Sequence, residues 1–139
     1  MQTFLPPLSF DESAKALDQR RLGKQRVECY QILRALTDPT YGWQHHPAVI
    51  MWRGHLPALV DYSLTMCEVW CEKGFSDSIA DKIYIEFGEH IQTDPKLPPW
   101  FERAEVFASH RAMLYRKDPN YYANFEPDSK LYNEYVWPT

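Results

Sequence analysis

Helix-boundary residues divide this chain more clearly than any other signal in it. Ser9 and Glu12 have the spacing of a capping box, which predicts that a helix begins near residue 10. This helical region is expected to break around Asp18 or Gly23, to resume, and to run to about residue 36, where a Thr-Asp-Pro sequence ends it. Alternation of the β type is confined to residues 84–87, which is too short to build a sheet.

Later proline and glycine residues predict further helices. The pair His46-Pro47 marks a second start, because proline suits the first turn of a helix. A third helix is expected over 55–73 and ends at Gly74, a left-handed cap. A weaker helix is expected over 78–91 and another over 98–117. We therefore expect an all-α fold of about four to five helices, followed by an irregular, aromatic-rich tail whose Tyr and Trp side chains cover the bundle.

The length of 139 residues and an aromatic content of 15% indicate a single compact domain over residues 1–139 with a large core. Four tryptophans are expected in that core: Trp43, Trp52, Trp70 and Trp100. Three cysteines are an odd number without scaffold spacing, which indicates a reducing, cytoplasmic setting. No apolar run reaches the length of a membrane span. We expect no metal and no cofactor, since zinc-ligand spacing and glycine-rich nucleotide loops are absent from the sequence. We also expect a monomer.

The net charge of −4 hides an uneven distribution of charge along the chain. Residues 15–34 carry six basic groups against two acids, whereas residues 61–94 carry eight acids against two lysines. The net charge of residues 95–117 is +3, and that of the tail, residues 118–139, is −3. Two basic segments sharing one face would favour a polyanionic partner. Ordinary solvated helix surfaces explain the charges equally well, so both interpretations stay open.

One acidic side chain lies within the first basic segment. The buried stripe of a helix over 20–36 consists of four residues: Leu22, Cys29, Leu33 and Leu36. Glu28 lies away from that stripe, between Lys24 and Arg21, and Arg26 lies at the border of the stripe. Glu28 either forms an i,i+4 ion pair with Lys24, which spacing alone favours, or places a carboxylate for chemistry where a polyanion docks.

The segment 17–28 (LDQRRLGKQRVE) resembles the N-terminal helix of the pyrimidine-dimer DNA glycosylases of the bacteriophage endonuclease V type. The resemblance continues in order through HPAV at 46–49, RGH at 53–55 with Leu59 and Tyr62, KGF at 73–75, and SHR at 109–111 to Tyr121-Tyr122. It therefore spans nearly the whole chain. It implies a small all-α repair enzyme that flips a nucleotide at a damaged site in double-stranded DNA and cleaves its glycosidic bond.

The resemblance also implies how the bond is cleaved. The free α-amine of the chain, here that of Met1, attacks C1′ of the sugar, and the resulting imine permits abasic-site lyase chemistry. The resemblance implies that Glu28 is the catalytic carboxylate. An α-amine has a reference pKa of about 7.7–8.0, against about 10.4 for lysine, so a larger fraction of it is neutral at pH 7. Lys24, one turn before Glu28, is the alternative amine.

The remaining site residues are basic groups expected to contact DNA phosphates. They are Arg20, Arg21, Lys24, Arg26, His46, His110, Arg111, Arg116 and Lys117. A histidine at a helix start more often caps or packs, although His46 can also donate to a phosphate. The second basic cluster, 110–117, is equally consistent with a solvated helix end. In the tail, Tyr121, Tyr122 or Trp137 is a candidate to wedge into or stack on DNA.

Two other functions remain open at this point. The acidic net charge and the bulky Gln2 are consistent with a non-catalytic binder of distorted DNA that shares the fold. A glycosidic-bond enzyme for a modified base is the further alternative.

Overall fold

The computed structural model describes residues 1–7 and 9–139. This part of the chain is built from α-helices and short 3-10 helices and contains no β-strand, which confirms the all-α prediction. The α-helices are α1 (Phe10–Ala16), α2 (Gln19–Thr37), α3 (Pro47–Ile50), α4 (Leu56–Glu72), α5 (Ile79–Phe87), α6 (Ala104–Lys117) and α7 (Glu126–Ser129). The 3-10 helices are Gly88–His90, Pro99–Glu102 and Ala123–Phe125.

The local boundary signals act as predicted at several helix ends. The Ser9 hydroxyl accepts a hydrogen bond from the Glu12 N–H at 3.0 Å and starts α1. The helical region breaks at residues 17–18 and then continues through Gly23, so of the two predicted break points only Asp18 is right. Gly74 follows α4 with φ +93°, in the left-handed region that glycine adopts without a Cβ clash.

The helix count exceeds the expected four to five because the first helical region is divided into α1 and α2 and because α7 lies in the tail. A helix of one turn, such as α7, shows no hydrophobic period, so the sequence pattern carries little sign of it. The tail is likewise less irregular than predicted, since α7 and the 3-10 turn at 123–125 lie within it. None of the described helices has both the length and the apolar character that crossing a lipid bilayer requires.

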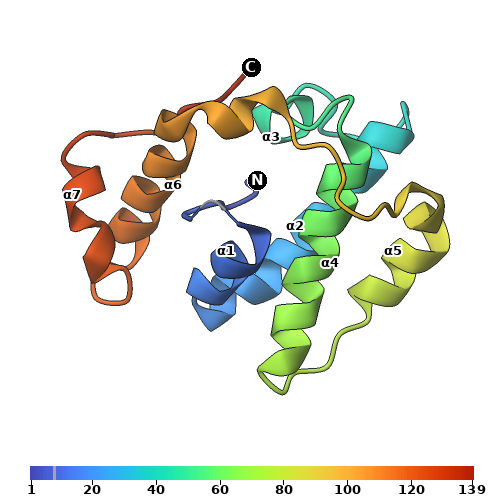
Figure 1. Cartoon of the computed structure of the whole chain (residues 1–139), viewed down its shortest axis with the longest axis horizontal. Coiled ribbons are helices and arrows are strands. Elements are labelled where there is room, and N and C mark those ends of the chain that lie inside the picture. Colours follow the sequence, from blue (N-terminus) through green and yellow to red (C-terminus); the bar gives the residue numbers. More distant parts are fainter. Residues whose placement is uncertain (8) are drawn as a thin grey trace.

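The core forms where α2 and α4 pack against each other, with α1 lying on α4 (Figure 1). Trp52 and Trp100 are buried there with their rings 5.1 Å apart, as predicted. Trp70 is partly buried and packs on the edge of the core. Trp43 is 58% exposed, so its assignment to the core is wrong.

Gly23 of α2 lies against the Trp70 ring of α4. A Cβ at this position would lie 2.9 Å from the Trp70 ring, which real Cβ atoms essentially never do. Glycine is therefore required by this contact rather than by backbone conformation, which is helical here.

Figure 1 shows the chain's first residues in the middle of the molecule, between α6 on one side and α2 and α4 on the other. Residues 2–5 are all buried. This buried N-terminal segment determines where the candidate site lies.

Candidate active site

Side chains of α2 hold the backbone of the N-terminal segment. The Gln2 N–H donates to Glu28 Oε2 at 3.1 Å, and the Gln2 carbonyl accepts from Gln25 Nε2 at 2.6 Å. Gln25 Oε1 in turn accepts from the Phe4 N–H at 2.9 Å. The side chains of Gln25 and Glu28, one turn apart on α2, therefore align the first residues along this helix. Met1 lies at the end of this segment that faces the pocket.

Other parts of the fold, α4 and α6 among them, also hold this segment. The Leu5 N–H donates to His110 Nδ1 at 3.0 Å, and the Tyr62 hydroxyl donates to the Phe4 carbonyl at 2.6 Å. Trp52 Nε1 donates to the Thr3 hydroxyl at 3.0 Å. Buried backbone groups need such partners, and here side chains supply them in place of a sheet.

Met1 lines a pocket of about 370 Å³. Ten described residues line it: Met1, Gln2, Phe4, Arg20, Arg21, Lys24, Gln25, Glu28, Lys117 and Tyr135. Among these lining residues four side chains are cationic and one is acidic. Lys117 comes from the second basic segment and the other cations from the first, so the two segments converge at this pocket. The volume falls within the range of small-ligand sites, about 300–1,000 Å³.

Glu28 makes the i,i+4 ion pair with Lys24 that its spacing favours, and a second contact that the sequence did not indicate. Its carboxylate lies 3.8 Å from Lys24 Nζ, but the lysine side chain is 75% exposed, so the ion pair contributes little stability. The Glu28 side chain is only 17% exposed and also accepts from the Gln2 backbone. The carboxylate thus lies one peptide unit from the Met1 amine, at the wall of a cationic pocket.

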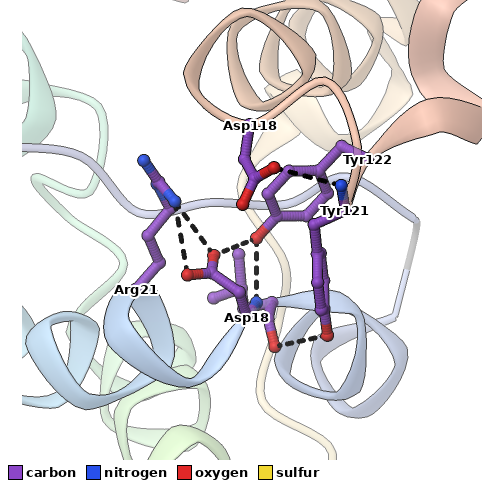
Figure 2. Close-up of polar contacts among 6 residues, drawn as sticks. Asp18, Arg21, Asp118, Tyr121 and Tyr122 are labelled. Atoms are coloured by element: carbon purple, nitrogen blue, oxygen red, sulfur yellow. Dashed lines mark hydrogen bonds and ion pairs between the residues drawn. The ribbon is translucent and has the colours of Figure 1, made fainter.

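Arg21 is the best anchored of the pocket cations (Figure 2). Its Nη1 donates to both carboxylate oxygens of Asp18, at 3.2 and 3.3 Å. The Tyr122 hydroxyl donates to the same carboxylate and accepts from the Asp18 N–H at 2.8 Å. Partial burial would raise the pKa of the Asp18 carboxyl, but the hydrogen bonds from Tyr122 and Arg21 outweigh it and lower that pKa. Tyr122 is buried, so it is not a residue that wedges into DNA.

Arg26 does not lie in the pocket, contrary to the sequence interpretation. Its guanidinium forms an ion pair with Asp77 and lies 4.4 Å from the centre of the Trp70 ring. Residues two apart on a helix are separated by about 200°, so Val27 between Arg26 and Glu28 turns the arginine to another side of α2.

The proposed phosphate contact at His110 is also wrong. Its ring is fully buried, and Nδ1 is occupied by the Leu5 N–H. Burial and the neighbouring Arg111 lower the pKa of His110 to about 3, so the ring is neutral. A buried neutral ring offers a phosphate neither access nor charge.

Two further arginines of α6 bind the chain itself. Arg111 forms an ion pair with Asp128 and donates to the Pro6 carbonyl at 2.8 Å. Arg116 Nη2 donates to the carbonyls of Ser129 and Tyr132. Both arginines therefore attach the tail to the bundle rather than pointing freely to a ligand.

His46 lies beside the pocket and caps α3, with Nδ1 accepting from the Ala48 N–H at 3.0 Å. Burial, and then the positive charge of the nearby N-terminal amine, lower the pKa of His46, while Glu28 opposes them. Its ring packs edge-on against Trp137 at 5.9 Å, and Trp137 contacts Tyr135 at 5.5 Å. Burial raises the pKa of Tyr135 to about 12, so this pocket hydroxyl stays protonated.

Sequence reasoning missed the residues that place the N-terminal segment, namely Gln25, Trp52 and Tyr62. Their partners lie 21 to 58 positions away, which no local pattern indicates. Within residues 1–7 and 9–139, no three His, Cys, Asp or Glu side chains gather as a metal site would require.

The chain was compared with known proteins in three ways. The family model of pyrimidine dimer DNA glycosylase matches residues 1–83, which include the N-terminal segment, Glu28 and three of the four pocket cations. Searches of curated proteins and of solved structures found no significant match. Because the matched residues make up more than half of the chain, it belongs to the pyrimidine dimer DNA glycosylase family.

Proposed function

We propose that this protein removes damaged pyrimidines from double-stranded DNA and then cuts the strand as an abasic-site lyase. The Met1 amine is the nucleophile, and Glu28 is the acid–base group. The observation that carries the proposal is the hydrogen bond from the Gln2 N–H to Glu28 Oε2, because it places the carboxylate one residue from the free amine. Membership of the family supports the glycosylase step and the DNA substrate.

The reaction divides between the two groups. The neutral amine attacks C1′, the bond from C1′ to the base breaks, and the base leaves with a proton. The sugar ring opens as its ring oxygen takes a proton from Glu28, which leaves an imine between the amine nitrogen and C1′. A base, again Glu28, then removes a C2′ proton, and the C3′–O bond breaks to release the 3′ phosphate. Such positioned proton transfer typically contributes about 10²–10⁴-fold to rate.

The cations of the pocket rim supply the remaining requirement, which is to hold a polyanion over a carboxylate. Arg20, Arg21, Lys24 and Lys117 are placed to contact phosphates on either side of the reacting nucleotide. They offset the repulsion between Glu28 and the phosphates, so a protein of acidic net charge can still bind DNA through this one face. We expect the protein to act as a monomeric single domain in the cytoplasm.

The experiment uses a duplex with an abasic site and borohydride, which reduces an imine to a stable cross-link. Wild-type protein is expected to form the cross-link on the peptide that begins with Met1. Glu28→Gln should retain DNA binding and lose strand cleavage by about 10²-fold or more. Lys24→Arg keeps the charge without the amine and should still be trapped.

The chain offers a matched control for Glu28. Glu126 pairs with Lys130 at the same i,i+4 spacing and the same 3.8 Å distance, but on α7, outside the pocket residues. Glu126→Gln should therefore leave cleavage unchanged. A cross-link mapped to Lys24 would refute the assignment of the nucleophile, and binding without any cleavage would identify the non-catalytic alternative.

A further inference from the structure

Trp43 is the most unusual surface residue of the molecule. Its side chain is 58% exposed, although the other four tryptophans are buried or partly buried. Its backbone has φ +69°, in the left-handed region that bulky residues avoid. An exposed indole on a strained backbone has a cost, and such outliers cluster at functional sites.

Hydrogen bonds hold the loop around Trp43 at several points. Gln44 Nε2 donates to three backbone carbonyls, those of Ala35, Asp38 and Tyr41, at 2.7 to 3.0 Å. Arg53 Nη2 donates to the Gln44 carbonyl at 2.8 Å, and the His46 N–H donates to the Trp43 carbonyl at 3.0 Å. These bonds anchor the backbone around Trp43, whose indole is exposed without any partner bound.

A continuous row of rings connects Trp43 to the pocket. Its indole packs edge-on against His46 at 5.8 Å. From His46 the row passes through Trp137 to Tyr135, which lines the pocket. Neighbouring bases of one DNA strand lie about 3.4 Å apart, so the three steps of this row together span at most about five base steps.

We propose that Trp43 is the stacking residue of the DNA interface, inserting its indole into the base stack within a few base pairs of the damaged nucleotide. This inference rests on the proposed function, since it takes duplex DNA as the ligand. A nucleotide that turns into the pocket leaves a gap in the stack, and a planar apolar ring fills such a gap. Every base has an aromatic face, so Trp43 contributes affinity for the opened site without selecting a sequence.

The other exposed aromatics fit this role less well. Tyr84 is 56% exposed but lies on α5, whose residues do not line the pocket. Tyr121 is 53% exposed and lies next to the buried Tyr122, whose hydroxyl is committed to Asp18.

The test measures binding to a duplex with a tetrahydrofuran abasic-site analogue, which cannot form an imine and so separates stacking from chemistry. Trp43→Ala should weaken this binding by about 5- to 150-fold, the fold-change that corresponds to loss of one base–aromatic stack. Trp43→Phe keeps a ring and should stay within about 3-fold of wild type. Tyr84→Ala, an exposed aromatic elsewhere, should leave binding unchanged, and all variants should melt at or near the wild-type temperature.

Tryptophan fluorescence supplies a second readout. The wild-type signal minus that of Trp43→Phe reports Trp43 alone, and it should be quenched by the analogue duplex more than by an intact duplex. Unchanged affinity of Trp43→Ala, or quenching that does not depend on the abasic site, would overturn the inference. Cleavage of a natural abasic site by wild-type protein is measured in parallel. If cleavage and imine trapping fail while Trp43→Ala still weakens binding, the proposed function falls and the stacking role stands.

Discussion

At the scale of single residues, the Asp18 carboxylate connects the pocket to the tail. It accepts hydrogen bonds from Arg21 and from the Tyr122 hydroxyl, so a residue near the end of the chain controls the position of a pocket cation. Asp18 is the N-cap residue of α2, but its carboxylate makes no capping hydrogen bond to the helix. The local sequence indicates the helix break at Asp18 but not the partners of its carboxylate.

Tyr122→Phe should therefore destabilise the protein by about 1–3 kcal/mol, because it leaves the Asp18 N–H without its acceptor in a partly buried place. Urea unfolding at pH 7 measures this difference. The neighbouring Tyr121→Phe is the control: its hydroxyl is 3.5 Å from the Leu17 carbonyl and its side chain is 53% exposed. Equal losses for the two variants would show that the hydroxyl contact to Asp18 is not what matters.

At the scale of elements, the close approach of α2 and α4 depends on one missing Cβ. The Trp70 ring that touches Gly23 is itself confined, with Phe75 packed on it at 4.5 Å and the Arg26 guanidinium at 4.4 Å. The ring cannot move aside without breaking these contacts. The geometry of the helix pair, and so the position of Glu28 opposite the N-terminal segment, is tied to this contact.

Gly23→Ala is expected to destabilise the protein by about 1–3 kcal/mol through overpacking, even though alanine is the better helix former by about 1 kcal/mol. Gly88→Ala is the matched control, since its φ is −57° and a Cβ there meets nothing within 4 Å. It should be neutral or slightly stabilising. Thermal melting of both variants decides the point, and a stabilised Gly23→Ala would mean that the ring adapts.

The helix boundaries could be predicted because capping serines, prolines and glycines act on neighbouring residues alone. Assignments that depend on contacts distant in sequence were less secure. Residue type alone favours Arg26 as a phosphate contact, but the helix phase turns it toward Asp77. An apolar side chain alone favours the core for Trp43, yet the indole is exposed to solvent. Whether a residue belongs to a site depends on where its side chain points as well as on its residue type.

At the scale of the whole molecule, a buried neutral histidine joins the two ends of the fold. His110 of α6 accepts from the Leu5 N–H, across 105 positions of sequence. Its Nε2 finds no hydrogen-bond partner among the described residues, so nothing nearby stabilises a positive charge on the ring. Protonation of His110 therefore destabilises the folded protein.

The pKa of His110 is about 3 in the folded chain, against an ordinary value of about 6.5 when unfolded. Between these values the unfolded chain binds one proton more, so stability falls as the pH falls through this window. The contribution is up to about 1.4 kcal/mol per pH unit. Urea unfolding at pH 7, 5 and 4 should show His110→Gln, which keeps an acceptor for the Leu5 N–H, losing less stability than wild type. Exposed His45→Gln should follow wild type, and parallel losses in all three proteins would contradict the prediction.

The buried N-terminal segment also has a consequence in time. Residues 2–5 are made long before α6, yet their backbone is held in part by a residue made much later, His110. A growing chain therefore carries this segment for most of its synthesis without all of the partners that hold it in the folded protein. Until α6 is complete and docked, His110 cannot hold the segment and Lys117 cannot line the pocket, so under the proposed function folding itself sets the moment at which the site is assembled.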